Sequence, residues 1–406
     1  MLPQVLALRT RFNRLTGAPP RAFWWLWGGS LVSALATFVL PFLTLFLTSH
    51  GFGVKAAGRV AALYGVGILA AGPVAGILAD RFGRRPTMIG SLFCASVATV
   101  LLAVVTAPEA LAGAIWLVGV SAASYRPAAM ALIADVVPIE GRTRAYGMLR
   151  WGNNLGLAVS SALGGALASI GYGTLFLVDA STTLAFALIV AARVPETRPR
   201  QAAPEDVRPG PDVRALLRDR LFLAFLALEF LFVLPLWQFQ VTLPIAMARE
   251  GHGPAAFGRV LAVNGVLITL LQPSLAAWAT RRGPARLLSV GMLLVGLGYG
   301  AYALCHSASA FALATGVWSL GEMVSMPVAA STVAALAPKT LRGRYQGAWS
   351  FAFGTGMTAA PVLGTAIMGR FGASALWASC LVVGAAAAAA FLSLAPGMRR
   401  RAARPA

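Results

Sequence analysis

The chain has 406 residues, of which 58% are hydrophobic and only 11% are charged. Soluble domains carry about 25% charged residues, so this composition excludes an ordinary soluble globular protein. The charges are mostly positive, with 33 Lys and Arg against 13 Asp and Glu and a formal net charge of +20. They lie scattered between long apolar segments, whereas nucleic-acid-binding proteins gather basic residues on a water-facing surface. We therefore expect no nucleic-acid partner.

Twelve long apolar segments are candidates for membrane-spanning helices, because a helix needs about 20 mostly apolar residues to cross the hydrocarbon core of a bilayer. Their hydrophobicity is continuous and does not alternate, which favours helices over a β-barrel. The sequence therefore predicts an all-α polytopic membrane protein with twelve transmembrane helices in a lipid bilayer. In chain order, the segments cover residues 22–48, 57–79, 86–105, 110–135, 145–170, 172–192, 221–247, 256–280, 285–304, 308–336, 345–368 and 372–395.

The distribution of positive charge predicts the orientation of these helices. Most of the 33 Lys and Arg residues fall on a single side of the membrane if both termini are placed on that side. Cytoplasmic loops carry an excess of Lys and Arg, so we expect both termini in the cytoplasm of a protein of the inner cell membrane. Two arginines, Arg126 and Arg150, lie well inside predicted spans, more than one helical turn from either end.

The chain repeats internally, because residues whose numbers differ by 200 match. Arg81 pairs with Arg281 and Pro127 with Pro327 in this register. Two parallel repeats of six helices, related by an axis along the membrane normal, are a transporter architecture. We expect a cytoplasmic N-terminal segment over 1–21, a six-helix half over 22–193, a cytoplasmic linker over 194–219, a second half over 220–396 and a basic cytoplasmic tail over 397–406.

The loop after the second span combines glycines, an acid and several arginines, namely Gly76, Asp80, Arg81, Gly83, Arg84 and Arg85. The glycine at its start permits close helix contact, and the glycine between its basic residues permits a tight turn. This pattern resembles the signature between helices two and three of the major facilitator superfamily. The resemblance implies the major facilitator fold of two pseudo-symmetric halves. It also implies that Asp80 lies at the inner N-terminus of the eleventh helix, where it stabilises the outward-facing state; the alternative is that the loop only fixes the orientation of the chain in the membrane.

The fifth span carries small residues whose spacing resembles the antiporter motif of the twelve-helix drug:proton antiporter family. Gly156 and Gly164 are retained, while Ser160-Ser161 stands where the family has Gly-Pro. Ordinary packing of small residues between helices is the alternative interpretation. The resemblance implies proton-coupled efflux of lipophilic, often cationic, small molecules.

Three of the thirteen acidic residues lie well inside predicted spans: Asp179, Glu229 and Glu322. Ionisable groups inside a membrane are costly and are candidates for function. Apolar surroundings favour the protonated form of a carboxyl group, which suits a group that binds and releases protons. We predict a proton-coupling set of Glu322 and Glu229, biased by Arg126, with Asp179 as a further candidate or a structural group. Which glutamate Arg126 pairs with is left open, and a static ion pair is the alternative.

Polar and aromatic side chains at helical spacing predict the surfaces that face a substrate cavity and not lipid. Aromatic and aliphatic walls with a few acids suit amphiphilic molecules. The predicted cavity residues are Trp237, Gln240 and Val233 in the seventh span, Thr315, Ser319 and Met326 in the tenth, Ser33 and Thr37 in the first, and Tyr125 in the fourth.

The motifs of common enzymes are missing from the sequence. It contains no His-Glu-x-x-His motif, Gly-x-Ser-x-Gly elbow or phosphate-binding P-loop, so no enzyme, cofactor or metal is expected. The leading hypothesis is a monomeric exporter that exchanges a small-molecule substrate for protons by alternating access. A proton-coupled importer of a small nutrient with the same fold is the alternative. A membrane sensor or intramembrane enzyme has less support, because the linker is too short for an output domain.

Overall fold

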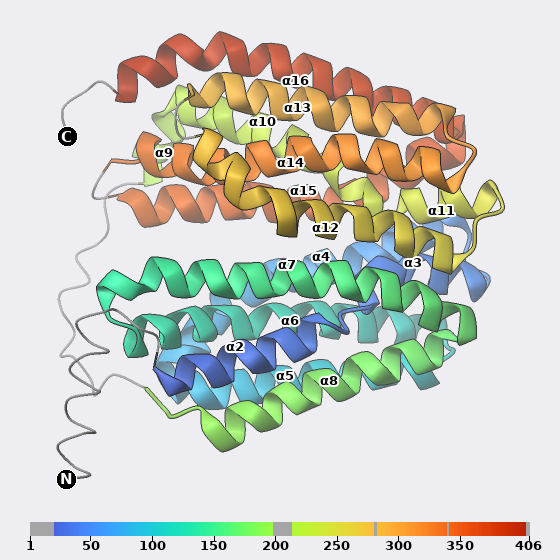
Figure 1. The fold of residues 1–406 in the computed structure, drawn as a ribbon, viewed down its shortest axis with the longest axis vertical. Coiled ribbons are helices and arrows are strands. Elements are labelled where there is room, and N and C mark those ends of the chain that lie inside the picture. Colours follow the sequence, from blue (N-terminus) through green and yellow to red (C-terminus); the bar gives the residue numbers. More distant parts are fainter. Residues whose placement is uncertain (1–19, 198–212, 280–281, 339–340, 403–406) are drawn as a thin grey trace. The chain divides into compact units, whose positions relative to one another are not determined.

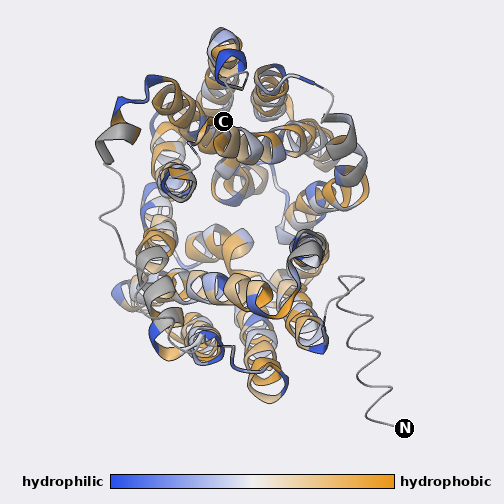
Figure 2. Ribbon diagram, turned by 90° about the vertical axis from the view of Figure 1, so that its left-hand side faces the viewer, coloured by the Kyte–Doolittle hydropathy of each residue, from blue (hydrophilic) through white to orange (hydrophobic). Residues whose placement is uncertain are grey.

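The computed structural model describes residues 20–197, 213–279, 282–338 and 341–402. Within these ranges the chain forms α-helices and short 3₁₀-helices and no β-strand. Eleven helical segments of the described residues are long and apolar enough to cross a membrane. Figure 2 shows that hydrophobic residues predominate along the helices. The prediction of an all-α polytopic membrane protein is confirmed.

The fifth predicted span is the one that does not belong to these eleven. It corresponds to α7 (Ile139–Ile170), which is a continuous helix of 32 residues. Polar residues such as Arg150, Asn153 and Asn154 lower its hydrophobicity. Helical structure therefore occurs in each of the twelve predicted spans, although two of them are interrupted and α7 is less apolar than the others.

The chain divides into two compact units that differ from the two sequence halves. Unit 1 comprises Met1–Val39 and Val66–Ala202, and unit 2 comprises Leu40–Gly65 and Ala203–Ala406. Residues 40–65 therefore group with the second half of the chain and not with the first. The boundaries predicted from the internal repeat describe sequence similarity, and they stay a prediction.

Unit 1 is built around α5 (Arg84–Val104), which packs between α6 (Pro108–Val136) and α8 (Tyr172–Arg193) (Figure 1). The first helix, α2 (Arg21–Ala34), packs on α7 and α8. Large side chains from these helices, including Phe23, Met88, Leu132 and Phe186, form one buried hydrophobic core. The second half of α4 (Val54–Phe82) also belongs to this unit.

Unit 2 is built around α13 (Pro284–Ala301), which packs between α14 (Ala308–Leu336) and α16 (Ala373–Ala402) (Figure 1). Its core contains a stack of aromatic rings that includes Tyr299, Trp318 and Trp377. The remaining elements are α3 (Val39–Ser49), the first half of α4, α9 (Val213–Arg218), α10 (Arg220–Leu236), η1 (Trp237–Gln240), α11 (Thr242–Arg249), α12 (Pro254–Ala279), η2 (Tyr302–Leu304) and α15 (Arg342–Phe371).

The first and seventh spans are interrupted, which corrects the prediction of continuous helices over 22–48 and 221–247. The first span stops after α2 and resumes as α3 at Val39, and the seventh passes from α10 through η1 to α11. Prolines lie beside both interruptions: Pro41 in the first turn of α3, and Pro235 and Pro244 on either side of η1. Proline has no N–H to donate and its ring displaces the preceding turn, so a helix readily breaks there.

Candidate functional site

Glu229 lies on α10 in the interior of unit 2, with 2% of its surface exposed. The indole Nε1 of Trp349 on α15 donates a hydrogen bond to its Oε2 at 3.0 Å. No cation of the described chain forms an ion pair with this carboxyl group. A neutral donor can bond to the carboxyl group of Glu229 in both its protonated and its ionised form. This group is therefore suited to take up and release a proton.

Glu322 lies on α14 and shares a donor with a second predicted residue. The amide Nδ2 of Asn264 on α12 donates to Glu322 Oε2 at 2.9 Å and to Ser319 Oγ at 3.0 Å. The Ser319 hydroxyl in turn donates to the carbonyl oxygen of Thr315 at 2.7 Å. The structure thus links Glu322, a predicted proton-coupling residue, to the predicted cavity residues Ser319 and Thr315 in one polar network.

Asn264 was missed by the sequence analysis although it organises this network. It is buried on α12 and donates hydrogen bonds to Ser319 and Glu322 of α14. The sequence does contain a signal for Asn264. An amide side chain within an apolar helix needs a hydrogen-bond partner when no water is near, which marks it as a candidate for contact with another helix.

Asp179 lies on α8 in unit 1, where it is 7% exposed. Its Oδ2 accepts hydrogen bonds from the backbone N–H groups of Phe38 at 2.7 Å and Val39 at 3.1 Å. These N–H groups have no partner within the first turn of α3, because a helix leaves its first N–H groups free. Asp179 therefore caps α3 from another helix, at the place where the first span is interrupted.

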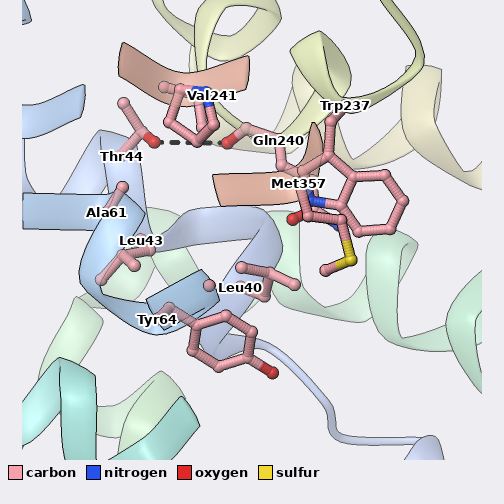
Figure 3. Close-up of a pocket in the computed structure, with 11 residues that line it drawn as sticks. Leu40, Leu43, Thr44, Ala61, Tyr64, Trp237, Gln240, Val241 and Met357 are labelled. Atoms are coloured by element: carbon pink, nitrogen blue, oxygen red, sulfur yellow. Dashed lines mark hydrogen bonds between the residues drawn. The ribbon is translucent and has the colours of Figure 1, made fainter. Parts of the chain in front are cut away.

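Two predicted cavity residues, Trp237 and Gln240, line a small pocket of unit 2. Leu40 of α3, Tyr64 of α4 and Met357 of α15 are among the other lining residues (Figure 3). The Thr44 hydroxyl donates to the Gln240 carbonyl oxygen at 3.3 Å. The free volume is about 10 Å³, which is room for about one water-sized group. The pocket in this structure is therefore too small for a drug-sized molecule.

The other predicted cavity residues lie elsewhere. Val233 packs against Gly356 of α15, and Met326 is half-buried on α14. In unit 1, the Ser33 hydroxyl lies 3.4 Å from that of Thr183 on α8, and Tyr125 packs edge-on against Phe186. Thr37 donates back to the Ser33 carbonyl oxygen at 3.0 Å. These contacts lie within the separate units, so the predicted substrate cavity, which combines residues of both units, stays a prediction.

Arg126 lies on α6 of unit 1, whereas Glu229 and Glu322 belong to unit 2. Its pairing with either glutamate stays a prediction. The fifth-span glycines are both buried in α7. A Cβ at Gly156 would come within 3 Å of the Ala34 backbone, so this glycine lets α7 approach α2 closely.

The basic loop between α4 and α5 is held by acids at one end of unit 1. Gly83 has a φ of +104°, which confirms the predicted tight turn. The Glu196 carboxylate accepts hydrogen bonds from the backbone N–H groups of Arg84 at 3.0 Å and Arg85 at 3.1 Å. The Arg84 guanidinium forms an ion pair with Asp135 on α6, with Nε 3.3 Å from Oδ2.

Glu196 is a second residue that the sequence analysis missed, because it was assigned to the linker. The acid directly follows the sixth span, in a position to meet the basic loop. Arg81 is exposed and its guanidinium lies over the Phe82 ring. The surroundings of Gly76 and the side chain of Asp80 lie outside the described part of the structure, so the stabilising contact assigned to Asp80 stays a prediction.

Comparison with known proteins gives consistent matches over most of the chain. The sequence pattern of the Major Facilitator Superfamily matches residues 26–248 and 230–406. A Na(+), Li(+), K(+)/H(+) antiporter of Planococcus maritimus is 25% identical over 80% of this chain and 84% of its own length. A multi-drug resistance efflux pump of Streptococcus pneumoniae is 26% identical over 86% of this chain and 90% of its own.

The fold is also similar to solved transporter structures. The crystal structure of a POT family transporter in complex with 5-aminolevulinic acid matches with a TM-score of 0.79. The match covers 93% of this chain and 97% of that chain, at 16% sequence identity. A likeness at this identity concerns the fold alone.

Proposed function

Since the chain belongs to the Major Facilitator Superfamily, we propose that this multi-pass membrane transporter exports lipophilic small molecules in exchange for protons. It is a transporter and not an enzyme. Two kinds of observation support the finer assignment. Relatives that cover most of the chain are named as an efflux pump and as a cation/proton antiporter, and two carboxyl groups lie on helices of unit 2 with neutral hydrogen-bond donors.

The buried carboxyl group of Glu229 is the observation that carries the proposal. A proton that enters from outside binds the Glu229 carboxylate and removes its charge, and the same proton is released on the cytoplasmic side. Trp349 serves both forms, because a carboxyl oxygen accepts its N–H whether or not the group is protonated. Glu322 and Asn264 form a second site of the same kind, and Arg126 favours the ionised form of a glutamate that it approaches.

Transport by everted membrane vesicles tests this proposal. In vesicles with an imposed pH gradient, the wild type is expected to move a lipophilic cation against its concentration gradient. The double variant E229Q/E322Q keeps amide groups of the same shape and is expected to lose at least tenfold in gradient-driven rate. The matched control is E250Q, which removes an exposed carboxylate after α11 and is expected to transport at the wild-type rate. Full pH-driven transport by the double variant would contradict the proposal.

Exchange of a monovalent cation for protons is a second candidate function. The Planococcus relative, a Na(+), Li(+), K(+)/H(+) antiporter, favours it, and ionised Glu229 and Glu322 are groups that bind Na⁺ or K⁺ as well as H⁺. The same vesicles distinguish the candidates when NaCl or KCl replaces the lipophilic cation. Proton movement that follows the salt and is insensitive to lipophilic cations would favour cation exchange.

Import of a small nutrient by the same fold is the remaining alternative. Intact cells distinguish it, because substrate added outside would then carry protons inward. We also propose that both termini are cytoplasmic in the inner membrane and that the chain acts as a monomer. Labelling of single cysteines introduced near residue 250 and near residue 400 tests the orientation, with only the former expected to react from outside.

A further inference from the structure

Unit 2 has an open pocket where α9 ends and α10 begins. The pocket has a volume of about 360 Å³, and three of its seven lining residues are arginines, Arg218, Arg220 and Arg401. Asp219 is the single acid of the lining, which therefore carries two more positive than negative charges. Small-molecule sites in proteins typically have volumes of about 300–1,000 Å³, so the space is adequate for a small anionic group.

The pocket already holds one anionic group of the chain itself. Asp219 Oδ2 accepts a hydrogen bond from the Tyr345 hydroxyl at 2.6 Å and forms an ion pair with Arg401 Nη1 at 2.6 Å. Its Oδ1 accepts from the backbone N–H of Phe222 at 3.2 Å. This carboxylate fixes Arg401, on α16, beside α10 and α15, and it shows that the walls accommodate an oxyanion.

The positive charges of Arg218 and Arg220 are not balanced by a carboxylate as that of Arg401 is. Both side chains are exposed, and neither has an acid as an ion-pair partner in the described chain. They flank Asp219 in the sequence, so their charges remain close to the pocket mouth. A guanidinium presents several N–H donors in a planar fork that matches the oxygens of a phosphate group.

The position of the pocket indicates where its ligand comes from. Arg220 and Arg401 are terminal residues of two candidate membrane spans, at the ends that the distribution of positive charge predicts to be cytoplasmic. Leu217, beside Arg218 on α9, is 61% exposed. An exposed leucine next to exposed arginines is the arrangement that interfacial segments use, with the apolar group among acyl chains and the charges at the headgroups.

We propose that this arginine pocket binds the phosphate headgroup of an anionic phospholipid in the cytoplasmic leaflet. Arg218 and Arg220 bind the phosphate oxygens, Arg401 is held in place by Asp219, and Leu217 contacts an acyl chain. Basic pockets at helix ends on the cytoplasmic side are suited to anionic headgroups. A soluble phosphate has the same oxyanion chemistry but no acyl chain to contact Leu217, which is why we assign a lipid.

Lipid binding to the purified full-length protein in a neutral detergent tests the proposal. Native mass spectrometry gives apparent dissociation constants for dioleoylphosphatidylglycerol and for dioleoylphosphatidylcholine, which has the same acyl chains. The wild type is expected to bind the anionic lipid at least tenfold more tightly. The variant R218Q/R220Q is expected to weaken this binding by about 30-fold, because each arginine near an anionic surface contributes about fivefold.

The matched control is R399Q/R400Q, which removes the same charge from exposed residues of α16 that do not line the pocket. It is expected to change the dissociation constant by less than threefold. Equal binding of the two lipids, or equal losses in the two double variants, would overturn the proposal. Inorganic phosphate that displaces the lipid at a concentration similar to that of the lipid itself would overturn the assignment to a lipid.

Discussion

The interruptions of the first and seventh spans occur at related positions of the internal repeat, and they are stabilised by different chemistry. In the first span, the ionisable Asp179 accepts the free N–H groups at the start of α3. In the seventh span, neutral groups satisfy the backbone: the Tyr299 hydroxyl donates to the Leu236 carbonyl oxygen at 2.7 Å. Gln238 Nε2 donates to the carbonyl oxygens of Leu234 and Ala360, each at 3.0 Å.

The hydrogen-bond donors also differ between two buried carboxyl groups, Asp179, to which we assign a structural role, and Glu229, for which we propose a role in proton coupling. Asp179 accepts two backbone N–H groups, and loss of its charge would weaken both bonds. Glu229 accepts a single neutral side-chain donor, so its protonation disrupts less. Burial alone therefore does not identify a proton carrier. We therefore expect the number and kind of donors around a carboxyl group to distinguish a structural acid from a proton carrier.

The largest effect is expected from removal of the cap in the first span. Asp179→Leu leaves the N–H groups of Phe38 and Val39 without their acceptor and should lower the free energy of unfolding by about 3 kcal/mol. Asp179→Asn keeps one acceptor oxygen and should cost less than half as much. Thermal unfolding of the purified variants in detergent measures both. If Asp179→Leu were as stable as the wild type, the capping role would be wrong.

A smaller loss is expected in the seventh span when Gln238 is replaced by leucine. The variant removes two donated hydrogen bonds and the acceptor of the Thr242 hydroxyl, and should cost about 2 kcal/mol, since hydrogen bonds between membrane helices contribute about 0.6 kcal/mol on average. Gln240→Leu is the matched control. The Oε1 atom of Gln240 is buried without a hydrogen-bond partner among the described residues. The Gln240→Leu variant should therefore be neutral or stabilising in the same unfolding assay. Equal losses in the two variants would show that packing, not hydrogen bonding, dominates here.

The smallest effect is expected for Tyr299→Phe, which removes one hydroxyl group and leaves the aromatic ring in place. The Leu236 carbonyl oxygen loses its donor, and the free energy of unfolding should fall by about 1 kcal/mol. The change should be independent of pH between pH 5 and 8, because no ionisable partner is involved at this bond. A pH-dependent loss would show that the two interruptions are more alike than their contacts indicate.

The fold was predictable from the sequence because its main determinants are local. The length of each apolar segment predicts a span, and Gly83 between Arg81 and Arg84 predicts the positive-φ turn that the structure contains. The superfamily signature in the same loop is likewise a contiguous run of residues.

The interruptions and the polar networks were less predictable, because their partners are distant in the chain. Asp179 caps a helix that begins 140 residues earlier, and Asn264 reaches an acid 58 residues later. Helical periodicity predicts Val233, Trp237 and Gln240 on one surface of a continuous helix, and η1 disrupts that periodicity. Thr315 and Ser319 are predicted on one surface of the tenth span, and α14 is unbroken over both.

Proton movement driven by substrate is the most direct test of the central claim, which is that Glu229 and Glu322 couple transport to protons. Purified protein would be reconstituted in liposomes that contain a pH-sensitive dye, with an outward gradient of a lipophilic cation and no initial pH gradient. The wild type is expected to acidify the lumen as the cation leaves, and E229Q/E322Q is expected to show no acidification above that of empty liposomes. Acidification by the double variant at the wild-type rate would contradict the account.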